Sequence, residues 1–346
     1  MTDYIIVGAG LSGIALAEEL TKRGKTIKVF DDNSQSSSTV AGGVFNPVIL
    51  KRFTLAWNAA IQLETAIPFY KELEEKLGVT LVEELPIYRK FNSVEEQNNW
   101  FAAADKRNLA PFLDTQLRQE LNPCLPSQHS FGRVKGTGRI NTGLLLERYR
   151  QLLNEQDGFS SEKFDYDKLE LSPEGVKYGR HEARRIIFCE GFGLKKNPYF
   201  SFLPLYGNKG EYIIIKAPAL KLEVAVKSSV FILPLGDDLY KVGATYNNQD
   251  TSEVPTEEAR ESLLKKLSEM ITCGFEIVDQ VSGIRPATKD RKPIVGRHPE
   301  LAHLYCCNGF GSRGVLMAPC IAKELAAHLE EGKPLDPETD LVRFLK

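Results

Sequence analysis

The segment 3–32 constrains the fold more than any other, because it contains a strand, a glycine-rich turn, a helix, a second strand and an acid in that order. The short apolar run at 3–7 predicts the first strand, and 11–23 predicts a helix with one apolar face. A second strand at 25–30 ends at two aspartates. A G-x-G-x-x-G motif between a strand and a helix predicts a binding turn for a dinucleotide.

Each glycine of this turn has its own expected role. Gly8 allows the tight turn after the strand, Gly10 lets a pyrophosphate approach the backbone, and Gly13 lets the helix pack close to the sheet. The phosphates would face the free N–H groups and the positive helix end at Leu11 and Ser12.

Two acids follow the second strand. Asp31 is the predicted acceptor for both hydroxyls of an adenosine ribose, with Asp32 as the second candidate. A carboxylate in this position disfavours a 2′-phosphate, so NADP is not expected. The turn and its acids leave both FAD and NAD open as cofactors.

The composition is that of an ordinary globular protein, with 42% apolar and 26% charged residues. A length of 346 residues predicts two domains or one large interleaved body. The 44 basic and 46 acidic residues nearly balance, so the chain as a whole lacks the positive charge excess that is typical of nucleic-acid-binding proteins. This balance does not exclude a local basic patch. No run has the length of a membrane helix, and 4–17 lacks the basic start of a signal peptide, so we expect a cytoplasmic protein.

The cysteines and histidines favour a structural role. The six cysteines contain no C-x-x-C pair, which is typical of free thiols in a reducing compartment. The five histidines lack metal-ligand spacing, so no metal site is predicted.

Periodicity and turn residues predict further elements along the chain. We expect helices at 54–77 (kinked or restarted near Pro68), 94–109, 111–121, 143–154 (capped by Asn141 or Thr142), 256–272 and 315–331. We expect a strand pair at 79–90, strands within 162–178, at 184–189 and at 304–307, and an antiparallel sheet within 199–246.

The C-terminal region repeats the order of strand, glycine-rich turn and helix seen at the start of the chain. The strand at 304–307 leads into the glycine-rich segment Gly309–Gly314 and then into a helix, which again offers N–H groups to a negative ligand. Gly42-Gly43 is another place where backbone can approach a ligand closely. Together with 283–296, these segments favour a long, extended FAD over a nicotinamide dinucleotide.

On these motifs the chain resembles the D-amino-acid oxidase/glycine oxidase (DAO) family of FAD-dependent oxidoreductases. The resemblance also includes Gly283-x-Arg285-Pro286-x-Thr288-x-Asp290-x-x-Pro293-x-x-Gly296 and the strand that ends at Cys189-Glu190-Gly191. It extends over nearly the whole chain, with two departures: Glu190 replaces a small residue, and the turn at 309–314 lacks a histidine.

Within the family, 308–319 and 45–47 most resemble the oxidase domain of the bifunctional bacterial enzyme that modifies carboxymethylaminomethyl-uridine at the tRNA wobble position. Because the chain begins directly at the flavin motif, we expect no fused methyltransferase domain in front of it.

The resemblance implies an α/β (overall α+β) fold, with a Rossmann-like FAD-binding domain interleaved with an antiparallel-sheet substrate domain. The FAD-binding domain would comprise 1–78, 130–194 and 275–346, and the substrate domain 79–129 and 195–274. The helix start near Ser312–Val315 would face the pyrimidine edge of the flavin. The cofactor, FAD, is expected to be bound non-covalently.

The resemblance also assigns site residues. Arg285 matches the position that clamps the substrate carboxylate, for which a guanidinium fork is suited, and Arg313 is a weaker candidate. The predicted FAD-binding residues are Gly8, Gly10, Leu11, Ser12, Gly13, Asp31, Asp32, Gly42, Gly43, Gly191, Gly309, Gly311, Ser312, Arg313, Gly314 and Val315. An ion pair between Arg285 and Asp290 is the structural alternative for that arginine. Tyr206, Tyr212 and Tyr246 are candidates for the cavity wall or for plain packing.

The resulting hypothesis is an FAD-dependent oxidase or dehydrogenase. It would oxidise the C–N bond of an amino acid or secondary amine with a carboxylate, by hydride transfer to flavin N5. The alternatives are a tRNA-modifying oxidase that removes a carboxymethyl group from a wobble uridine, and a non-catalytic flavin- or NAD-binding protein. A tRNA substrate would need a basic rim, for which the candidates are Lys51, Arg52, Arg133, Lys135, Arg139, Arg291 and Lys292. No membrane partner is expected, and the oligomeric state stays open.

Overall fold

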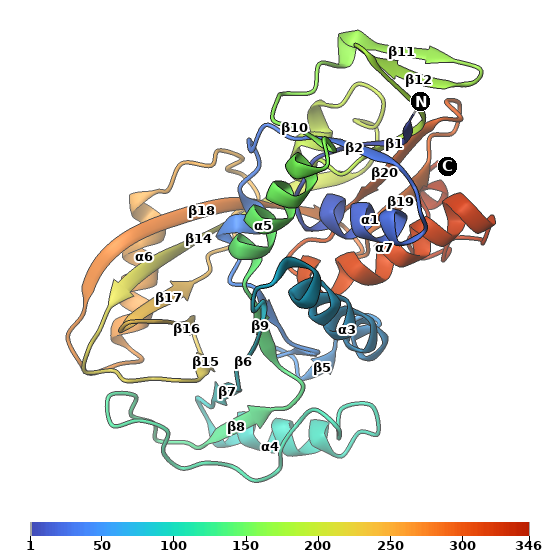
Figure 1. The fold of residues 1–346 in the computed structure, drawn as a ribbon. Helices are drawn as coiled ribbons and strands as arrows, with labels where there is room; N and C mark the ends of the chain where they lie inside the picture. The colour runs from blue at the N-terminus through green and yellow to red at the C-terminus, as the bar shows by residue number, and fades with distance from the viewer. Residues whose placement is uncertain (1, 346) are drawn as a thin grey trace.

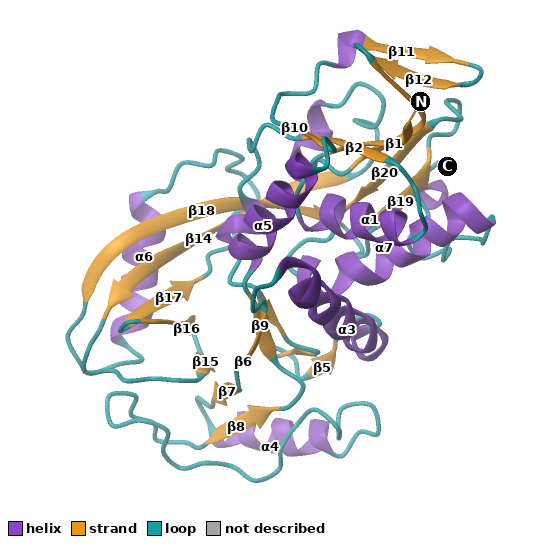
Figure 2. Cartoon of the chain, in the orientation of Figure 1, coloured by secondary structure: helices purple, strands orange, loops and turns teal. Residues whose placement is uncertain are grey.

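The computed structural model describes residues 2–345, which form two large sheets with helices packed around them (Figures 1 and 2). The predicted order at the start of the chain is confirmed by β1 (Thr2–Val7), α1 (Leu11–Lys22) and β2 (Ile27–Phe30). β1 is central in an eight-stranded sheet, where it runs parallel to β2 on one side and to β13 (His181–Phe188) on the other. This is the α/β arrangement predicted from the glycine motif. Residues 1 and 346, at the ends of the predicted FAD-binding segments, lie outside the described residues.

The eight-stranded sheet brings together three distant segments of the chain. β20 (Leu304–Asn308) runs parallel to β13, so the carboxyl ends of β1, β13 and β20 reach the same edge of the sheet. The remaining strands are β10 (Phe159–Ser160), β11 (Leu169–Ser172), β12 (Gly175–Tyr178) and β19 (Ile294–Arg297). Ligands of open α/β sheets bind at such a carboxyl edge.

The second sheet has seven strands, in the order β18-β14-β17-β16-β15-β7-β8. Its strands are β7 (Ile87–Lys90), β8 (Phe131–Val134), β14 (Leu205–Lys216), β15 (Ala225–Lys227), β16 (Phe231–Gly236), β17 (Leu239–Gly243) and β18 (Glu276–Thr288). The pairings within 199–246 are antiparallel as predicted, while β15 pairs with β7 in parallel. Figure 1 shows β14 and β18 as the long curved edge of this sheet. β8 and β18 come from segments assigned by sequence to the FAD-binding domain, yet their pairing is with the other sheet.

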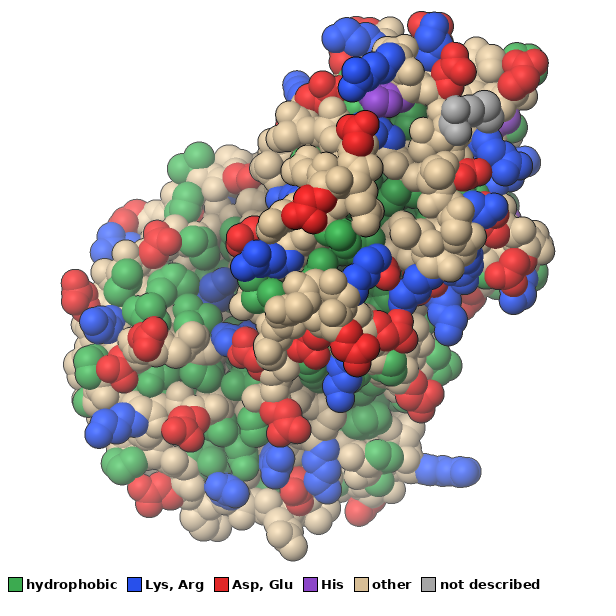
Figure 3. Space-filling view, in the orientation of Figure 1, with side chains coloured by type: hydrophobic (Ala, Val, Ile, Leu, Met, Phe, Trp, Pro, Cys, Tyr) green, Lys and Arg blue, Asp and Glu red, His purple; other side chains and the backbone are tan. Residues whose placement is uncertain are grey.

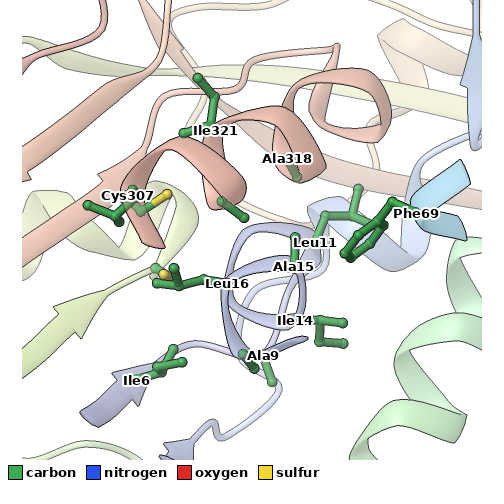
Figure 4. Close-up of a cluster of buried hydrophobic side chains, with 14 of the residues drawn as sticks. Ile6, Ala9, Leu11, Ile14, Ala15, Leu16, Phe69, Cys307, Ala318 and Ile321 are labelled. Carbon is green, nitrogen blue, oxygen red and sulfur yellow. The ribbon is translucent and has the colours of Figure 1, made fainter. Parts of the chain in front are cut away.

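Four helices bury one face of the eight-stranded sheet: α1, α3 (Ala59–Leu77), α5 (Thr142–Glu155) and α7 (Gly314–Glu331). Figure 4 shows the centre of this core, where Leu11, Ala15 and Leu16 of α1 lie near α7 and β20. α6 (Glu257–Ser268) packs on the seven-stranded sheet, and α4 (Val94–Ala104) buries Trp100 beside β7 and β8. No helix in 2–345 is long and apolar enough to cross a membrane.

Short elements complete the chain. They are α2 (Ser37–Val40), β3 (Val44–Phe45), β4 (Val48–Ile49), β5 (Thr54–Leu55), β6 (Val82–Glu84), β9 (Gly138–Ile140) and the 3₁₀ helices η1 (Tyr166–Lys168), η2 (Gly191–Lys196) and η3 (Leu341–Phe344). β3, β9 and β6 form a three-stranded sheet, and β4 pairs with β5.

Three predicted elements differ from the structure in part or as a whole, each for a tertiary reason. The helix predicted from residue 54 begins only at Ala59, because β5 and the left-handed Asn58 (φ 48°) precede it, and it continues through Pro68 without a restart. Both strands predicted around Pro86 form, as β6 and β7, but they do not pair with each other. β6 pairs with β9 and β7 with β8, since the chain changes sheets at Leu85-Pro86.

The third error is the helix predicted at 111–121. That segment instead runs along β8, with bridges from Leu113 to Val134 and from Arg118 to Phe131. The Trp100 indole donates to the Asp114 carbonyl (2.9 Å), which holds the segment against α4. Pairing with a strand far along the chain has therefore overridden local helix propensity.

Candidate functional site

A single large cleft of about 1810 Å³ contains almost all of the predicted site residues. One part, which we call the turn end, is lined by the Gly8–Leu11 turn, the end of β2 and the loop after β13. The other part, the sheet end, is lined by β14, β17 and β18, the loop around Asn46 and the turn at 309–314. All of the predicted FAD-binding residues except Gly13 line this cleft.

The geometry at Gly8 and Gly13 supports their expected roles. Gly8 has a left-handed backbone (φ 102°), and a Cβ there would lie 2.5 Å from the Cys189 carbonyl oxygen. A Cβ at Gly13 would lie 1.8 Å from the Gly8 carbonyl oxygen. The absence of Gly13 from the cleft therefore matches its predicted role in helix packing.

Asp31 stands at the turn end with part of its side chain toward the cleft. Its Oδ2 accepts from the Ala9 N–H (2.5 Å), and its Oδ1 accepts from the Asn33 N–H (2.7 Å) and lies 3.4 Å from Arg150 Nη2. These contacts hold the Asp31 carboxylate beside the glycine turn, where a ribose would lie.

Asp32 is the more exposed neighbour of Asp31. Burial raises the pKa of Asp32, but hydrogen bonds from Ser34 outweigh this effect and leave its pKa below the usual value. Both carboxylates line the turn end of the cleft, so the acceptor role can belong to either.

A second helix N-terminus opens into the same cleft. Asn308 at the end of β20 fixes the turn that precedes α7: its Nδ2 donates to the Gly191 carbonyl (2.9 Å), and its Oδ1 accepts from the Gly309 N–H (2.8 Å). In the described chain, neither Gly10 before α1 nor Arg313 before α7 makes a side-chain capping bond. Two helix starts thus offer N–H groups and positive dipole ends to one extended ligand.

The Gly42-Gly43 segment forms part of the wall between the two ends of the cleft. Gly43 is left-handed (φ 66°), and a Cβ there would lie 2.0 Å from the Ile140 carbonyl oxygen. A Cβ at Gly42 would lie 2.8 Å from Leu233 Cδ1. Packing of this loop on β9 therefore requires glycine at position 43 whether or not a ligand is bound, whereas the Leu233 side chain could shift to make room at position 42.

Arg285 extends from β18 into the sheet end. Its Nη1 donates to Asn208 Oδ1 (2.8 Å) and lies 3.4 Å from the Thr245 carbonyl, and its guanidinium carbon is 4.7 Å from the centre of the Tyr246 ring. Within 2–345 no carboxylate lies within ion-pair distance of Arg285, and Asp290 pairs with Arg343 instead (3.2 Å). The structural alternative for Arg285 is therefore wrong, and its charge is free for a ligand.

Arg313 also lines the sheet end, with its Nη1 donating to the Asn46 carbonyl (3.0 Å). Burial lowers its pKa, and the nearby groups that act on its charge are Tyr246 and Arg291. Within the described residues it has no carboxylate partner either.

The other predicted residues divide between cleft and surface. Tyr206, Tyr212, Tyr246, Lys51 and Arg291 line the cleft. Among the rim candidates, Arg139 is engaged with Glu83 and Lys292 with Glu338, and neither lines the cleft. Figure 3 shows acidic and basic side chains interspersed on the visible face.

Sequence reasoning missed several cleft residues. Ser38 Oγ accepts from the Leu11 N–H (3.3 Å) at the start of α1, and Gly210 on β14 faces Arg285. Glu190 lines the turn end, where it accepts hydrogen bonds from the Tyr166 hydroxyl and from Asn197 Nδ2 (2.8 Å). Burial raises the pKa of Glu190 to about 7. The polar run at 33–39 and the unusual glutamate were the available signals for Ser38 and Glu190.

The chain has clear relatives. A family profile described as "FAD dependent oxidoreductase" (DAO) matches residues 3–328. Glycine oxidase of Bacillus subtilis is 34% identical over 346 residues, covering 92% of this chain and 90% of that protein. The bifunctional tRNA 5-methylaminomethyl-2-thiouridine biosynthesis protein MnmC of Azoarcus sp. is 30% identical over 185 residues, which cover 47% of this chain and only 29% of that relative. The crystal structure of glycine oxidase from Geobacillus kaustophilus matches with a TM-score of 0.80 at 22% identity, covering 99% of this chain and 97% of that one.

Proposed function

The chain belongs to the DAO family of FAD-dependent oxidoreductases, and on that premise we propose that it oxidises the C–N bond of an amino acid or secondary amine that carries a carboxylate. The observation that carries the proposal is Arg285, a guanidinium in the cleft with no carboxylate partner among the described residues. A planar fork of donors is suited to a bidentate carboxylate.

The residues of the cleft fit FAD. The turn end offers two acids for a ribose and the α1 N-terminus for a pyrophosphate, and the α7 N-terminus lies farther along the same cleft. The volume of about 1810 Å³ exceeds the usual size of small-molecule pockets, as an extended dinucleotide requires. FAD, held non-covalently, would supply the two-electron chemistry.

The protein's part in the reaction is mainly positioning. Arg285 would hold the substrate carboxylate, with Asn208 and Tyr246 fixing the plane of its guanidinium. A substrate held in this way would present the C–H bond next to its nitrogen to the bound cofactor. Among the described residues no group of three metal-ligating side chains is present, and the mechanism requires none.

The test is anaerobic bleaching of the bound flavin by glycine, sarcosine, proline and D-amino acids. Arg285→Met should raise KM by about tenfold to a hundredfold, because a charge-assisted contact contributes about 1.5–3 kcal/mol. Arg297→Met, at an exposed position outside the cleft, is the matched control and should not change KM. An unchanged KM in Arg285→Met would remove the assigned role of this arginine.

A second candidate function is oxidation of a modified uridine in tRNA. It is favoured by the similarity to the bifunctional tRNA-modification protein and by the positions of Lys51 and Arg291 in the cleft. Binding of tRNA that weakens steeply with salt, together with flavin bleaching by carboxymethylaminomethyl-modified tRNA, would support it.

We also keep the interleaved two-domain division and a cytoplasmic location as proposals, the latter because all six cysteines are free thiols.

A further inference from the structure

The two ends of the cleft differ in charge. The turn end contains both signs: Asp31, Asp32, Asp165, Glu190 and Glu253 face Lys163, Lys168, Lys195 and Lys196. The sheet end contains five cations, Lys51, Lys227, Arg285, Arg291 and Arg313, and one carboxylate, Asp290. Asp290 is neutralised by Arg343, so the sheet end has an excess of positive charge.

None of these five cations has an acidic partner within the described part of the chain, residues 2–345. Lys227 lies near other cations, Arg89 and Lys266, and burial lowers its pKa to about 8. The half-buried Arg313 contacts a backbone carbonyl, and its charged neighbour is another arginine, Arg291. Lys51 and Arg291 are exposed, but Lys227, Arg285 and Arg313 are partly buried. Keeping partly buried cations without an acidic partner costs free energy, and a bound anion would relieve that cost.

Arg285 and Arg313 are held close to one another by the backbone. The Gly311 N–H donates to the Pro286 carbonyl (2.8 Å), so the residue after Arg285 is bonded to a residue two before Arg313. Tyr246 is the common neighbour, because its ring stacks with the guanidinium of Arg285 and it also lies near Arg313. Both guanidinium groups therefore belong to the same small region of the cleft.

The sheet end carries more positive charge than one carboxylate neutralises. If Arg285 binds the carboxylate next to the reacting nitrogen, the charges of Arg313 and of its neighbour Arg291 remain without an anion. The neighbours of Arg313 are residues of the sheet end rather than of the turn end, where a pyrophosphate would lie.

Resting on the proposed function, we propose that the substrate carries two anionic groups, with one carboxylate bound at Arg285 and the second at Arg313 and Arg291. The chemical class is an amine or amino acid with two carboxylates. Arg313 then determines specificity between dicarboxylate and monocarboxylate amines.

The closing experiment measures binding without turnover, through the shift of the flavin absorption bands in the holoenzyme. Thiodiacetate and (methylthio)acetate are a matched pair of inert probes, because each has sulfur in place of the reacting nitrogen, with two carboxylates or one. We expect the wild type to bind thiodiacetate at least tenfold more tightly, and Arg313→Met to abolish that preference while (methylthio)acetate binding changes less than about threefold. Arg313→Lys should retain part of the preference, and Arg297→Met all of it.

The outcomes separate this inference from the proposed function. If the two probes bind equally, or if Arg313→Met weakens both to the same extent, the two-anion site is wrong. If thiodiacetate is preferred through Arg313 but neither sarcosine nor iminodiacetate bleaches the flavin anaerobically, the site stands and the proposed oxidation is wrong. If thiodiacetate is not preferred over (methylthio)acetate while tRNA displaces both probes in a salt-dependent way, the cations bind nucleic-acid phosphates and the inference fails.

Discussion

Gly210 leaves the space that the Arg285 guanidinium occupies, since a Cβ at Gly210 would lie 1.9 Å from Arg285 Nη2. The two residues are on neighbouring strands, where the register pairs Asn208 with Arg285 and Gly210 with Gly283. A missing side chain on β14 thus lets an arginine from β18 lie flat across the sheet beside Asn208. This relationship ties the strand register directly to the proposed carboxylate site.

The first prediction follows from that contact. Gly210→Ala should displace the Arg285 guanidinium and raise KM for a carboxylate substrate about tenfold or more, because the charge-assisted contact is lost. Steady-state kinetics would measure the change. Gly274→Ala is the matched control, because no atom lies within 4 Å of its Cβ position. Unchanged KM in Gly210→Ala would mean that Arg285 does not bind the substrate from this position.

The second prediction concerns the glycine turn. Gly13→Ala places a methyl group where the Gly8 carbonyl lies, so the start of α1 must move away from the turn. We expect purified protein with less than about a tenth of the wild-type FAD content, measured as flavin absorbance per polypeptide. Gly143→Ala in the first turn of α5, whose Cβ position has only one neighbour at 3.8 Å, should retain full FAD content. Full FAD content in Gly13→Ala would remove the packing argument.

The third prediction uses the elevated pKa of Glu190. Because its pKa is raised from 4.5 to about 7 in the folded protein, the folded state holds a proton that the unfolded state has released between those values. The free energy of unfolding should therefore decrease as pH rises from about 4.5 to about 7. The contribution of this group is at most about 3 kcal/mol, and less because the side chain is partly exposed.

Glu190→Gln tests this dependence. Glutamine cannot ionise, so the variant should be more stable than the wild type at pH 8 and no more stable at pH 4.5, by urea denaturation of the holoenzyme. A stability difference that is the same at both pH values would contradict the assignment of the pH dependence to Glu190.

The fourth prediction concerns Lys209, which is fully buried beneath the loop at 247–256. Its Nζ lies 2.5 Å from Asp250 Oδ2 and 3.5 Å from Glu211 Oε1. Lys209→Met leaves these acids without their cation, so the free energy of unfolding should fall by about 3–5 kcal/mol. Lys216→Met, at the exposed end of the same strand, should change it by less than about 0.5 kcal/mol. Equal stability of the two variants would show that the buried cation does not hold the loop.

Local features of the chain were sufficient to predict much of the nucleotide-binding half. β1, the glycine turn, α1 and β2 form a unit whose pattern and turn residues agree with its tertiary environment. Asn141 accepts from the Leu144 N–H (3.1 Å) and so caps α5, as one of the two residues proposed for that role.

The errors lie where distant pairing decides the conformation. The segment after Pro111 has helical composition, yet it pairs with β8, and the strands around Pro86 join different sheets. β18 follows a helix and precedes the C-terminal motif, but its hydrogen bonds are with β14, far earlier in the chain. No local sequence pattern identifies such a pairing partner, because the free energy that stabilises the pairing comes from contacts between residues far apart in the chain.

The candidate site shows the same contrast between features that local sequence predicts and features that depend on distant contacts. The sequence alone predicted that a dinucleotide cradle begins at Gly8 and that Asp31 or Asp32 stands beside it, since both depend on short-range spacing. Arg285 became a candidate for binding a carboxylate through the resemblance to the DAO family. Only the tertiary structure decided that Asp290 pairs with Arg343, that Gly210 makes room for Arg285, and that unpaired cations gather at the sheet end. The physical reason is that ionic partners and free space are set by strand register and by the packing of α7 against the eight-stranded sheet, which bring together residues far apart in the chain.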